Sequence, residues 1–381
     1  MSEMFSVMLA AGGTGGHLFP AYALAEELQR RDIAVDLITD LRGDRYGSGF
    51  PARTVYQVQS ATLASKAASD IAKTTLALAR GTKAAFSILG NVKPRAVIGF
   101  GGYPTYPPLV AARLRGIPTA VHEQNAVLGR ANRLLAKRVT AIATSFENTK
   151  YLDGGLIAKA TLTGNPVRQI VVDAAARDYI APASDGPVHI LVFGGSQGAR
   201  YFSDAVPPAL IALPDALRAR LHVTQQAREE DVQRVSDAYG EHGIAAEIAP
   251  FFKDLPERMA AAHLVIGRAG ASTVAELTVM GRPSILVPLP HALDNDQLNN
   301  ARRLAESGGG WCIEQRNLTS ERLADEIERL VAAPATLAAA AAAAKTAGRP
   351  DAVSRLADFV VALAGRGGSE HSPAEPRVTT A

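Results

Sequence analysis

VMLAAGGTGGH at residues 7–17 and HILVFGGSQGA at residues 189–199 decide the fold of this chain. Each stretch is a short apolar run, which predicts a buried strand, followed by a glycine-rich turn and the start of a helical pattern. Glycines let the backbone approach a ligand closely, and the helix start behind them offers unpaired N–H groups and a positive dipole end. Two such turns predict two nucleotide-type domains that face each other across a cleft.

The length and composition of the chain limit the classes of protein to which it can belong. The chain has 381 residues, 47% of them hydrophobic and 20% charged, which suits two globular domains. The formal net charge of +3 does not indicate nucleic-acid binding, and the single cysteine, Cys312, excludes an intramolecular disulfide and fits a reducing compartment. We expect no secretory segment, and no apolar run reaches the ~18 residues of a membrane span.

Strand and helix patterns alternate in both halves, which predicts α/β domains with doubly wound parallel sheets. The stretch 263–291 repeats the order of 97–125: strand, glycine turn, helix, Gly-x-Pro, strand and histidine-bearing loop. We therefore expect an internal duplication of fold. Asn165-Pro166 breaks the pattern and predicts a boundary, giving domains at 1–165 and 166–348, a terminal helix at 349–364 and a disordered tail at 365–381.

The first glycine turn lacks the full spacing of a dinucleotide-binding fingerprint, although Asp40 stands near the position of its acidic residue. The pattern favours a phosphate or sugar site, with His17 at its mouth, over a redox enzyme. The second turn matches a hydrolase nucleophile elbow at Ser196, with His222, His242, His263 and His291 as possible bases. We favour a phosphate-binding Ser196, because this role explains both turns together.

GRAGASTVAE places Ala271, Ser272 and Thr273 at a helix start, with Glu276 about one turn inside. A diphosphate fits the helix N-terminus, and the carboxylate can accept hydrogen bonds from both ribose hydroxyls. Asp294-Asn295-Asp296 resembles a metal-binding D-x-D motif, but a loop and helix cap is the favoured interpretation, so we expect no metal.

Polar residues follow two adjacent strands of the first half: Tyr103 on one, and His122, Glu123 and Asn125 on the next. Ligands of open α/β sheets bind at the carboxyl ends of strands, so these side chains are expected near His17.

Residues 66–95 carry Lys66, Lys73, Arg80, Lys83, Lys93 and Arg95 against one acid, Asp70, with apolar residues interleaved. Such a segment is typical of a helix on an anionic membrane surface or of an ordinary helix packed on a sheet, and both interpretations stay open. RNA binding is less favoured, because aromatic interleaving is absent.

GGTGGHLFPAYALAEEL, GFGGYP, HEQNAVLGRANRLLA, TGNPVR, FGGSQGAR and GRAGASTVAEL, in this order, closely resemble the MurG family of peptidoglycan glycosyltransferases, from about Phe5 to Leu363. The resemblance implies a GT-B fold of two Rossmann-like domains, with the final helix crossing back onto the first. It also implies inverting transfer of GlcNAc from UDP-GlcNAc to the C4 hydroxyl of the muramyl sugar of lipid I, without a cofactor, giving lipid II and UDP.

The resemblance also implies roles for single residues. His17 is the first candidate base and Glu123 the second, Tyr103 lies on the acceptor side, and the uracil is expected near Phe252. The donor contacts that it implies are Thr14, Gly15, Gly16, Asn125, Arg168, Ser196, Glu276 and Gln297, beside the helix start at Ala271, Ser272 and Thr273. Many relatives have Gln or His where this chain has Asp296.

The lipid-linked acceptor implies a peripheral protein at the cytoplasmic face of the bacterial inner membrane, in contact with anionic lipid, with cell-wall synthesis and division proteins as possible partners and no nucleic acid. The alternatives are a GT-B enzyme for another acceptor, a UDP-GlcNAc 2-epimerase and a catalytically inactive sugar-nucleotide-binding subunit.

Overall fold

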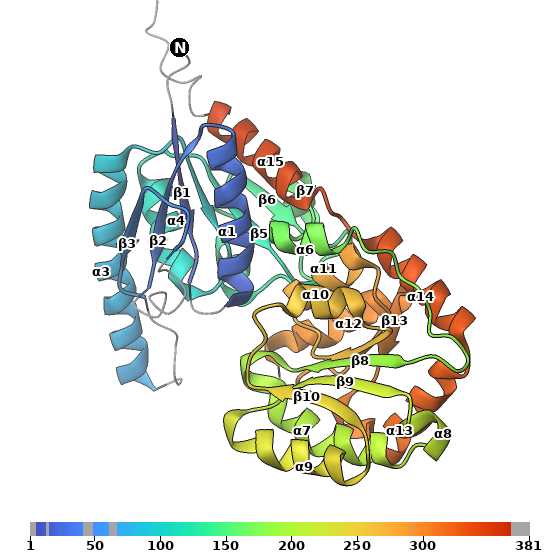
Figure 1. Cartoon of the computed structure of the whole chain (residues 1–381). Helices are drawn as coiled ribbons and strands as arrows, with labels where there is room; N and C mark the ends of the chain where they lie inside the picture. Colours follow the sequence, from blue (N-terminus) through green and yellow to red (C-terminus); the bar gives the residue numbers. More distant parts are fainter. Residues whose placement is uncertain (1–4, 13–14, 41–48, 61–66, 291, 367–381) are drawn as a thin grey trace, which may run out of the picture. The chain divides into compact units, whose positions relative to one another are not determined.

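The computed structural model describes residues 5–12, 15–40, 49–60, 67–290 and 292–366 (Figure 1). The chain divides into two compact units. Unit 1 comprises Met1–Gln124, Leu128–Pro166 and Asp351–Ala381, and unit 2 comprises Asn125–Val127 and Val167–Pro350. The sequence placed the boundaries after residues 165 and 348. Residues 367–381, most of the predicted tail, lie outside the described residues.

Unit 1 is built on a parallel sheet whose seven described strands have the order β3-β2-β1-β4-β5-β6-β7. The strands are β1 (Ser6–Ala10), β2 (Ala34–Thr39), β3 (Thr54–Gln57), β4 (Ala96–Gly99), β5 (Thr119–Glu123), β6 (Ala141–Thr144) and β7 (Ala160–Leu162). Leu9 of β1 pairs with Leu37 on one side and Ile98 on the other. The central strands are continuous apolar runs because helices cover both faces of the sheet.

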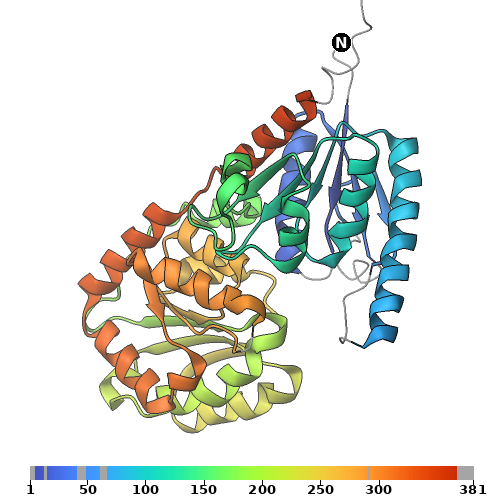
Figure 2. The same ribbon diagram turned by 180° about the vertical axis from the view of Figure 1, so that it is seen from behind.

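The helices of unit 1 form two layers, one on each face of the sheet (Figure 1 and Figure 2). They are α1 (Gly15–Arg30), α3 (Ala68–Val92), α4 (Tyr106–Leu114), α5 (Arg130–Ala136) and α15 (Ala352–Arg366), with 3₁₀ turns η1 (Tyr103–Thr105) and η2 (Gly154–Lys159). On one face α1 and α15 share a core with Val7 and Leu9. On the other face α3, α4 and α5 share a core with Met8 and Val97.

Helix α15 belongs to unit 1, although it follows unit 2 in the sequence. Its buried side chains include Leu356, Val360 and Leu363, which pack into the same core as α1. Arg31, just after α1, forms an ion pair with Asp358 and donates to Ser354 Oγ at 2.9 Å. The last helix is thus part of the first core.

Unit 2 repeats the plan with six described strands in the order β10-β9-β8-β11-β12-β13, all parallel. The strands are β8 (Val188–Phe193), β9 (Leu221–Gln226), β10 (Ala245–Ala249), β11 (Leu264–Gly267), β12 (Ser284–Leu286) and β13 (Gly310–Cys312). The helices are α6 (Gln169–Ala174), α7 (Gly195–Ile211), α8 (Asp215–Arg218), α9 (Val232–Glu241), α10 (Leu255–Ala261), α11 (Ala271–Met280), α12 (Asp296–Glu306), α13 (Ser320–Val331) and α14 (Pro334–Ala347), with 3₁₀ turns η3 (Glu229–Asp231), η4 (Leu293–Asn295) and η5 (Gln315–Asn317).

Within the described residues, no single helix is long and apolar enough to cross a membrane. By length and composition only, one helix pair bent by 92°, Ser320–Val331 with Pro334–Arg366, passes the same test. Buried apolar residues of this pair, including Leu323 and Ile327, belong to the core of unit 2.

Candidate functional site

Each sheet has one point where the strand order reverses. In unit 2 this point lies between β8 and β11, because the chain continues from β8 outward through β9 and from β11 outward through β12. In unit 1 it lies between β1 and β4. Ligands of open α/β sheets bind at such points, outside the carboxyl ends of the strands. Most of the predicted site residues lie in the loops that follow these strands or in the first turns of the helices after them.

The loop after β8 is the second glycine turn. Gly195 has φ +64°, in the left-handed region that favours glycine, and it begins the 17-residue helix α7. At Gly267, which ends β11, an added Cβ would lie 3.0 Å from the Phe193 carbonyl oxygen. The Ser196 side chain lies outside the described part of the structure, so its phosphate-binding role stays a prediction.

The loop after β11 leads to the predicted helix start. Gly270 precedes α11 with extended backbone, φ −61° and ψ 148°, and no side chain of the described residues caps the helix there. The N–H groups of Ala271, Ser272 and Thr273 lie in the first turn and therefore have no intrahelical acceptor. Ser272 Oγ is buried without a hydrogen-bond partner among the described residues. An anion such as a diphosphate fits this terminus.

Glu276 lies one turn inside α11, and its residue is only 9% exposed. Arg168 precedes α6 and places Nη2 3.5 Å from Glu276 Oε1. Burial raises the pKa of Glu276, and the guanidinium of Arg168 acts in the opposite direction. A buried carboxylate with one long ion pair gains from further hydrogen-bond donors, which the two hydroxyls of a ribose would supply.

Asn125 lies within unit 2, although the first half of the sequence encodes it. Asn300 of α12 donates from Nδ2 to Asn125 Oδ1 at 3.0 Å and to the Ala269 carbonyl at 3.1 Å, and its Oδ1 accepts from Ala126 N at 2.8 Å. Asn300 thereby fixes Asn125 beside the turn that precedes α11. The sequence analysis missed Asn300, and its only signal was a pair of asparagines in a helical pattern.

Arg268 is a second residue that the sequence analysis missed. Its Nη1 donates to the Val287 and Pro288 carbonyls at 3.1 and 3.2 Å, and its Nη2 donates to Gln315 Oε1 at 2.8 Å. Burial lowers the pKa of Arg268 to about 10. The guanidinium thus ties the loop after β11 to the loop after β12.

Gln297 and Asp296 begin helix α12. Gln297 Oε1 accepts from Leu289 N at 2.9 Å, which holds the loop after β12, and Asp296 Oδ1 accepts from Gln297 N at 2.7 Å. Burial raises the pKa of Asp296. These contacts agree with a loop and helix cap. Among the described residues, no group of three or more His, Cys, Asp or Glu side chains could hold a metal ion.

In unit 1 the loops after β1 and β4 place His17 against glycines. His17 lies in the first turn of α1, behind Gly15 and Gly16, whereas Thr14 lies outside the described residues. Gly101 (φ +86°) and Gly102 (φ +72°) follow β4, and an added Cβ there would lie 3.2 Å from His17 Cε1 and 3.3 Å from Cδ2. Only glycine allows this backbone to pack against the imidazole ring.

A chain of hydrogen bonds runs from His17 into the sheet. His17 Nδ1 lies 3.2 Å from Gln124 Oε1, Gln124 Nε2 lies 3.0 Å from His122 Nδ1, and His122 Nε2 lies 3.0 Å from the Gly164 carbonyl. Burial lowers the pKa of His17 below its ordinary value, whereas hydrogen bonds to Gln124 and the Phe100 backbone act in the opposite direction. Burial also lowers the pKa of His122 to about 4. Both rings are therefore neutral near pH 7.

Glu123 ends β5 and is only 1% exposed. Its Oε2 accepts from Gly129 N and from Asn132 Nδ2, both at 2.8 Å. The carboxylate thus holds the start of α5. Tyr103, the predicted acceptor-side residue, begins η1 directly after Gly102 and is partly exposed.

The alternative of a serine hydrolase is wrong for the histidines that the structure describes. His222 begins at the amino end of β9 and His263 precedes β11, whereas the Gly194 turn follows the carboxyl end of β8. His242 follows α9, which returns from the carboxyl to the amino ends of the strands. These three histidines therefore lie at the amino ends of the strands, on the side of the sheet edge opposite to the Gly194 turn. His291 lies outside the described residues.

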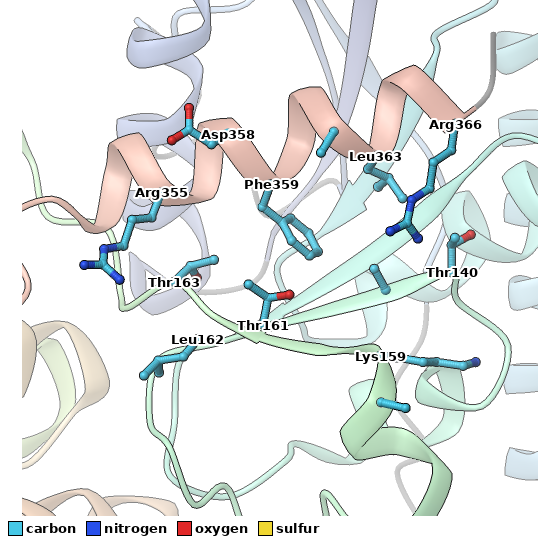
Figure 3. A pocket seen from close by; sticks show the side chains of 13 residues that line it. Thr140, Lys159, Thr161, Leu162, Thr163, Arg355, Asp358, Phe359, Leu363 and Arg366 are labelled. Carbon is cyan, nitrogen blue, oxygen red and sulfur yellow. The ribbon is translucent and has the colours of Figure 1, made fainter. Parts of the chain in front are cut away.

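A cavity of about 520 Å³ lies in unit 1 between η2, β7 and α15. Figure 3 shows Lys159, Thr161, Phe359 and Arg366 among its lining side chains. None of the predicted site residues lines it. The cavity is therefore separate from the site at β1 and β4.

Comparisons with known proteins cover most of the chain. Residues 7–144 match the model of the glycosyltransferase family 28 N-terminal domain, and residues 189–356 match that of the C-terminal domain. The chain is 53% identical to a protein of Nitrobacter hamburgensis over 358 residues, and this alignment covers 94% of this chain and 97% of that protein. It is 54% identical over 358 residues to a protein of Mesorhizobium japonicum, with 94% and 95% coverage.

Both relatives are named UDP-N-acetylglucosamine–N-acetylmuramyl-(pentapeptide) pyrophosphoryl-undecaprenol N-acetylglucosamine transferase. Among solved structures, MurG of Acinetobacter baumannii matches with a TM-score of 0.77 and 29% identity, covering 94% of this chain and 99% of that one. The two parallel-sheet units agree with the GT-B fold. The chain belongs to the MurG family of N-acetylglucosamine transferases, within glycosyltransferase family 28.

Proposed function

We propose that this enzyme transfers GlcNAc from UDP-GlcNAc, with inversion, to the C4 hydroxyl of the MurNAc-pentapeptide of undecaprenyl-pyrophosphate lipid I, giving lipid II and UDP in peptidoglycan synthesis. The observation that carries the proposal is 53% identity over 94% of the chain to a transferase named for this reaction. The alternatives, a transferase for another acceptor, a 2-epimerase or an inactive binding subunit, have no support of comparable identity and coverage.

Unit 2 binds the donor in this proposal. The diphosphate lies at the N-termini of α7 and α11, near Ser196 and Ser272, and the ribose hydroxyls donate to Glu276, with Arg168 beside it. Asn125 and Gln297 complete the donor contacts. Negative charge grows on the diphosphate as the bond to the sugar breaks, and preorganised N–H groups stabilise that charge without needing to reorient. This part of the reaction requires no metal.

Unit 1 binds the acceptor and supplies the base. His17 Nε2 takes the proton of the C4 hydroxyl, the oxygen attacks C1 of GlcNAc, and the bond from C1 to the diphosphate oxygen breaks as UDP leaves. A neutral imidazole is the form that accepts a proton, and burial keeps His17 neutral. Tyr103 lies on the acceptor side. Glu123 is the second candidate base, but its hydrogen bonds favour a role in holding the loop.

The acceptor is lipid-linked, and one surface of unit 1 suits contact with anionic lipid. Along α3, Lys73, Arg80 and Lys83 are exposed, together with Leu76 at 52% and Phe86 at 40%. Arg115 lies 3.8 Å over the Phe86 ring. We call Lys73, Leu76, Arg80, Lys83 and Phe86 the α3 surface.

The same helix packs Ala85 and Leu89 into the core, so the interpretation as a helix packed on a sheet holds for that face, and the lipid contact is proposed for the exposed face. Lys66 lies outside the described residues. Apolar side chains between cations favour the interface of an anionic bilayer. We therefore infer a peripheral enzyme at the cytoplasmic face of the inner membrane. Cell-wall synthesis and division proteins are further proposed partners.

The test is a transfer assay with labelled UDP-GlcNAc and three conditions: lipid I, a plain glycolipid, and no acceptor. We expect labelled lipid II with lipid I alone. Transfer to the plain glycolipid would support another acceptor, and conversion of the donor without any acceptor would support an epimerase. A parallel reaction in EDTA is expected to retain its turnover.

A further inference from the structure

We propose that Gln124 is a positioning residue that fixes the protonation pattern of His17, placing the proton on Nδ1 so that the lone pair of the neutral ring is on Nε2. The inference rests on the proposed function only in that His17 is the base. It concerns a chain of four groups within unit 1: His17, Gln124, His122 and the Gly164 carbonyl.

The orientation of the Gln124 amide follows from a backbone contact. Gln124 Nε2 lies 3.1 Å from the His122 carbonyl oxygen, which can only accept a hydrogen bond. The nitrogen of the amide must therefore face His122, and Oε1 must face His17 Nδ1 at 3.2 Å. Because an amide oxygen only accepts, His17 Nδ1 must carry the proton.

The far end of the chain requires the same arrangement. His122 Nε2 lies 3.0 Å from the Gly164 carbonyl, so this nitrogen carries a proton and donates it. In a neutral ring the other nitrogen then accepts, and His122 Nδ1 receives the second N–H of Gln124 at 3.0 Å. The ring stays neutral because it is fully buried. A protonated His122 would place an N–H group against the amide N–H.

The contacts among these four groups are therefore satisfied in only one way, set by the carbonyls of His122 and Gly164. Which nitrogen of a histidine carries the proton depends on the hydrogen bond that the other nitrogen makes. Gln124 makes that bond to Nδ1, so the lone pair of neutral His17 is on Nε2. A histidine base with the wrong tautomer loses its function while its position is kept.

The experiment measures tautomers directly in the free, full-length protein by long-range ¹H–¹⁵N NMR after selective ¹⁵N-histidine labelling. The unaltered protein should show His17 protonated at Nδ1 and His122 at Nε2. Gln124→Met keeps the length of the side chain but removes both hydrogen-bonding groups. In that variant we expect His17 to shift toward the Nε2–H form, and kcat to fall by about 10- to 100-fold with the KM for UDP-GlcNAc little changed.

Gln124→Glu retains an acceptor opposite His17 Nδ1. We expect His17 to keep the Nδ1–H form, and the acid limb of kcat/KM to move to higher pH because a carboxylate raises the pKa of the ring. Gln225→Met is the matched control. Gln225 is a buried glutamine of unit 2 that donates to the Phe202 carbonyl and accepts from Tyr239, so its loss should leave the His17 signals unchanged.

An Nε2–H tautomer of His17 in the unaltered protein would overturn the proposal, as would an unchanged tautomer in Gln124→Met. A changed tautomer with unchanged kcat would also overturn the positioning role. Failure of the proposed function is distinguishable, because it would show as full activity in His17→Ala, whereas the tautomer is read without any acceptor substrate.

Discussion

At the scale of single residues, polar side chains near the two strand-order reversals are held by other polar side chains. Asn300 holds Asn125, Arg168 faces Glu276, and Gln124 links His17 to His122. Buried polar groups are costly unless they are hydrogen-bonded, so such networks fix geometry. This rigidity is what a site needs when it must stabilise charge on a leaving diphosphate.

The role of His17 is tested by His17→Ala. We expect kcat to fall by about 10²- to 10⁴-fold, the usual contribution of a positioned general base, with little change in UDP affinity, because most of the proposed donor contacts lie in unit 2. Steady-state kinetics and calorimetry with UDP measure the two effects. His222→Ala, at the amino end of β9, is the control, and its kcat and UDP affinity should be near those of the unaltered enzyme. Unchanged kcat in His17→Ala would refute the assignment.

The pH profile tests the same ring in the unaltered enzyme. Burial lowers the pKa of His17 below 6.5, so the base is neutral at pH 7 and becomes protonated only when the pH falls below that lowered value. The acid limb of kcat/KM for the acceptor should therefore lie below pH 6.5. An acid limb above pH 7 would contradict this environment for His17.

Glu276→Gln tests the donor site. The amide keeps the shape of the side chain but loses the charge that strengthens hydrogen bonds from the ribose, so UDP affinity should fall by about 1.5–3 kcal/mol, roughly 10- to 150-fold. Calorimetry measures this directly. Glu306→Gln, an exposed glutamate at the end of α12, should bind UDP normally. Equal affinity in both variants would exclude the diol contact.

The sequence predicted which residues lie at strand ends but not what holds them. His17 and Glu276 could be predicted because each follows a recognisable strand and turn, and Glu123 and Asn125 because they stand at the end of a recognisable strand. Asn300 could not, because its partners Asn125 and Ala126 lie 175 and 174 residues away and no pattern links them. The direction of the Gln124 amide likewise depends on tertiary contacts.

At the scale of secondary-structure elements, the long apolar strands and the helices after the glycine turns match the sequence analysis. The short strands β3, β7 and β13 were not identified, because they lie at the edges of the sheets, are mostly not buried and show no continuous apolar run. The α3 helix was foreseen as amphipathic, but only the structure shows which residues enter the core and which stay exposed.

The α3 surface is tested by charge reversal. Lys73→Glu, Arg80→Glu and Lys83→Glu together should release the protein from anionic vesicles, because each basic residue near such a surface contributes about 1 kcal/mol. Vesicle sedimentation at low and high salt measures the effect. A triple reversal at Lys253, Arg302 and Arg316, exposed cations of unit 2, changes the net charge equally and should bind normally. Unchanged binding of the α3 variant would argue against this surface.

At the scale of the whole molecule, stability should depend on pH through His122. Its pKa is about 4 in the folded protein and about 6.5 when unfolded, so between these values the unfolded chain binds more protons. The contribution of His122 to stability is fully present above pH 6.5, and the free energy of unfolding falls by about 3 kcal/mol as the pH drops to 4. Denaturant unfolding at pH 7 and 4.5 measures this loss. His122→Gln should have a lower free energy of unfolding at pH 7 than the unaltered protein, but it should lose less of that free energy on acidification. A loss equal to that of the unaltered protein would contradict the buried neutral ring.

Helix α15 has a consequence for how the polypeptide is made. Domains usually fold in the order in which the ribosome releases them. Here the first core lacks Leu356, Val360 and Leu363 until all of unit 2, which precedes these residues in the sequence, has been translated. The core of the nascent amino-terminal half therefore stays incomplete, with apolar surface uncovered, while all of unit 2 is synthesised. A premature stop codon directly after Pro350 would leave the residues of unit 2 complete, but the core of unit 1 would lack α15 and could not close.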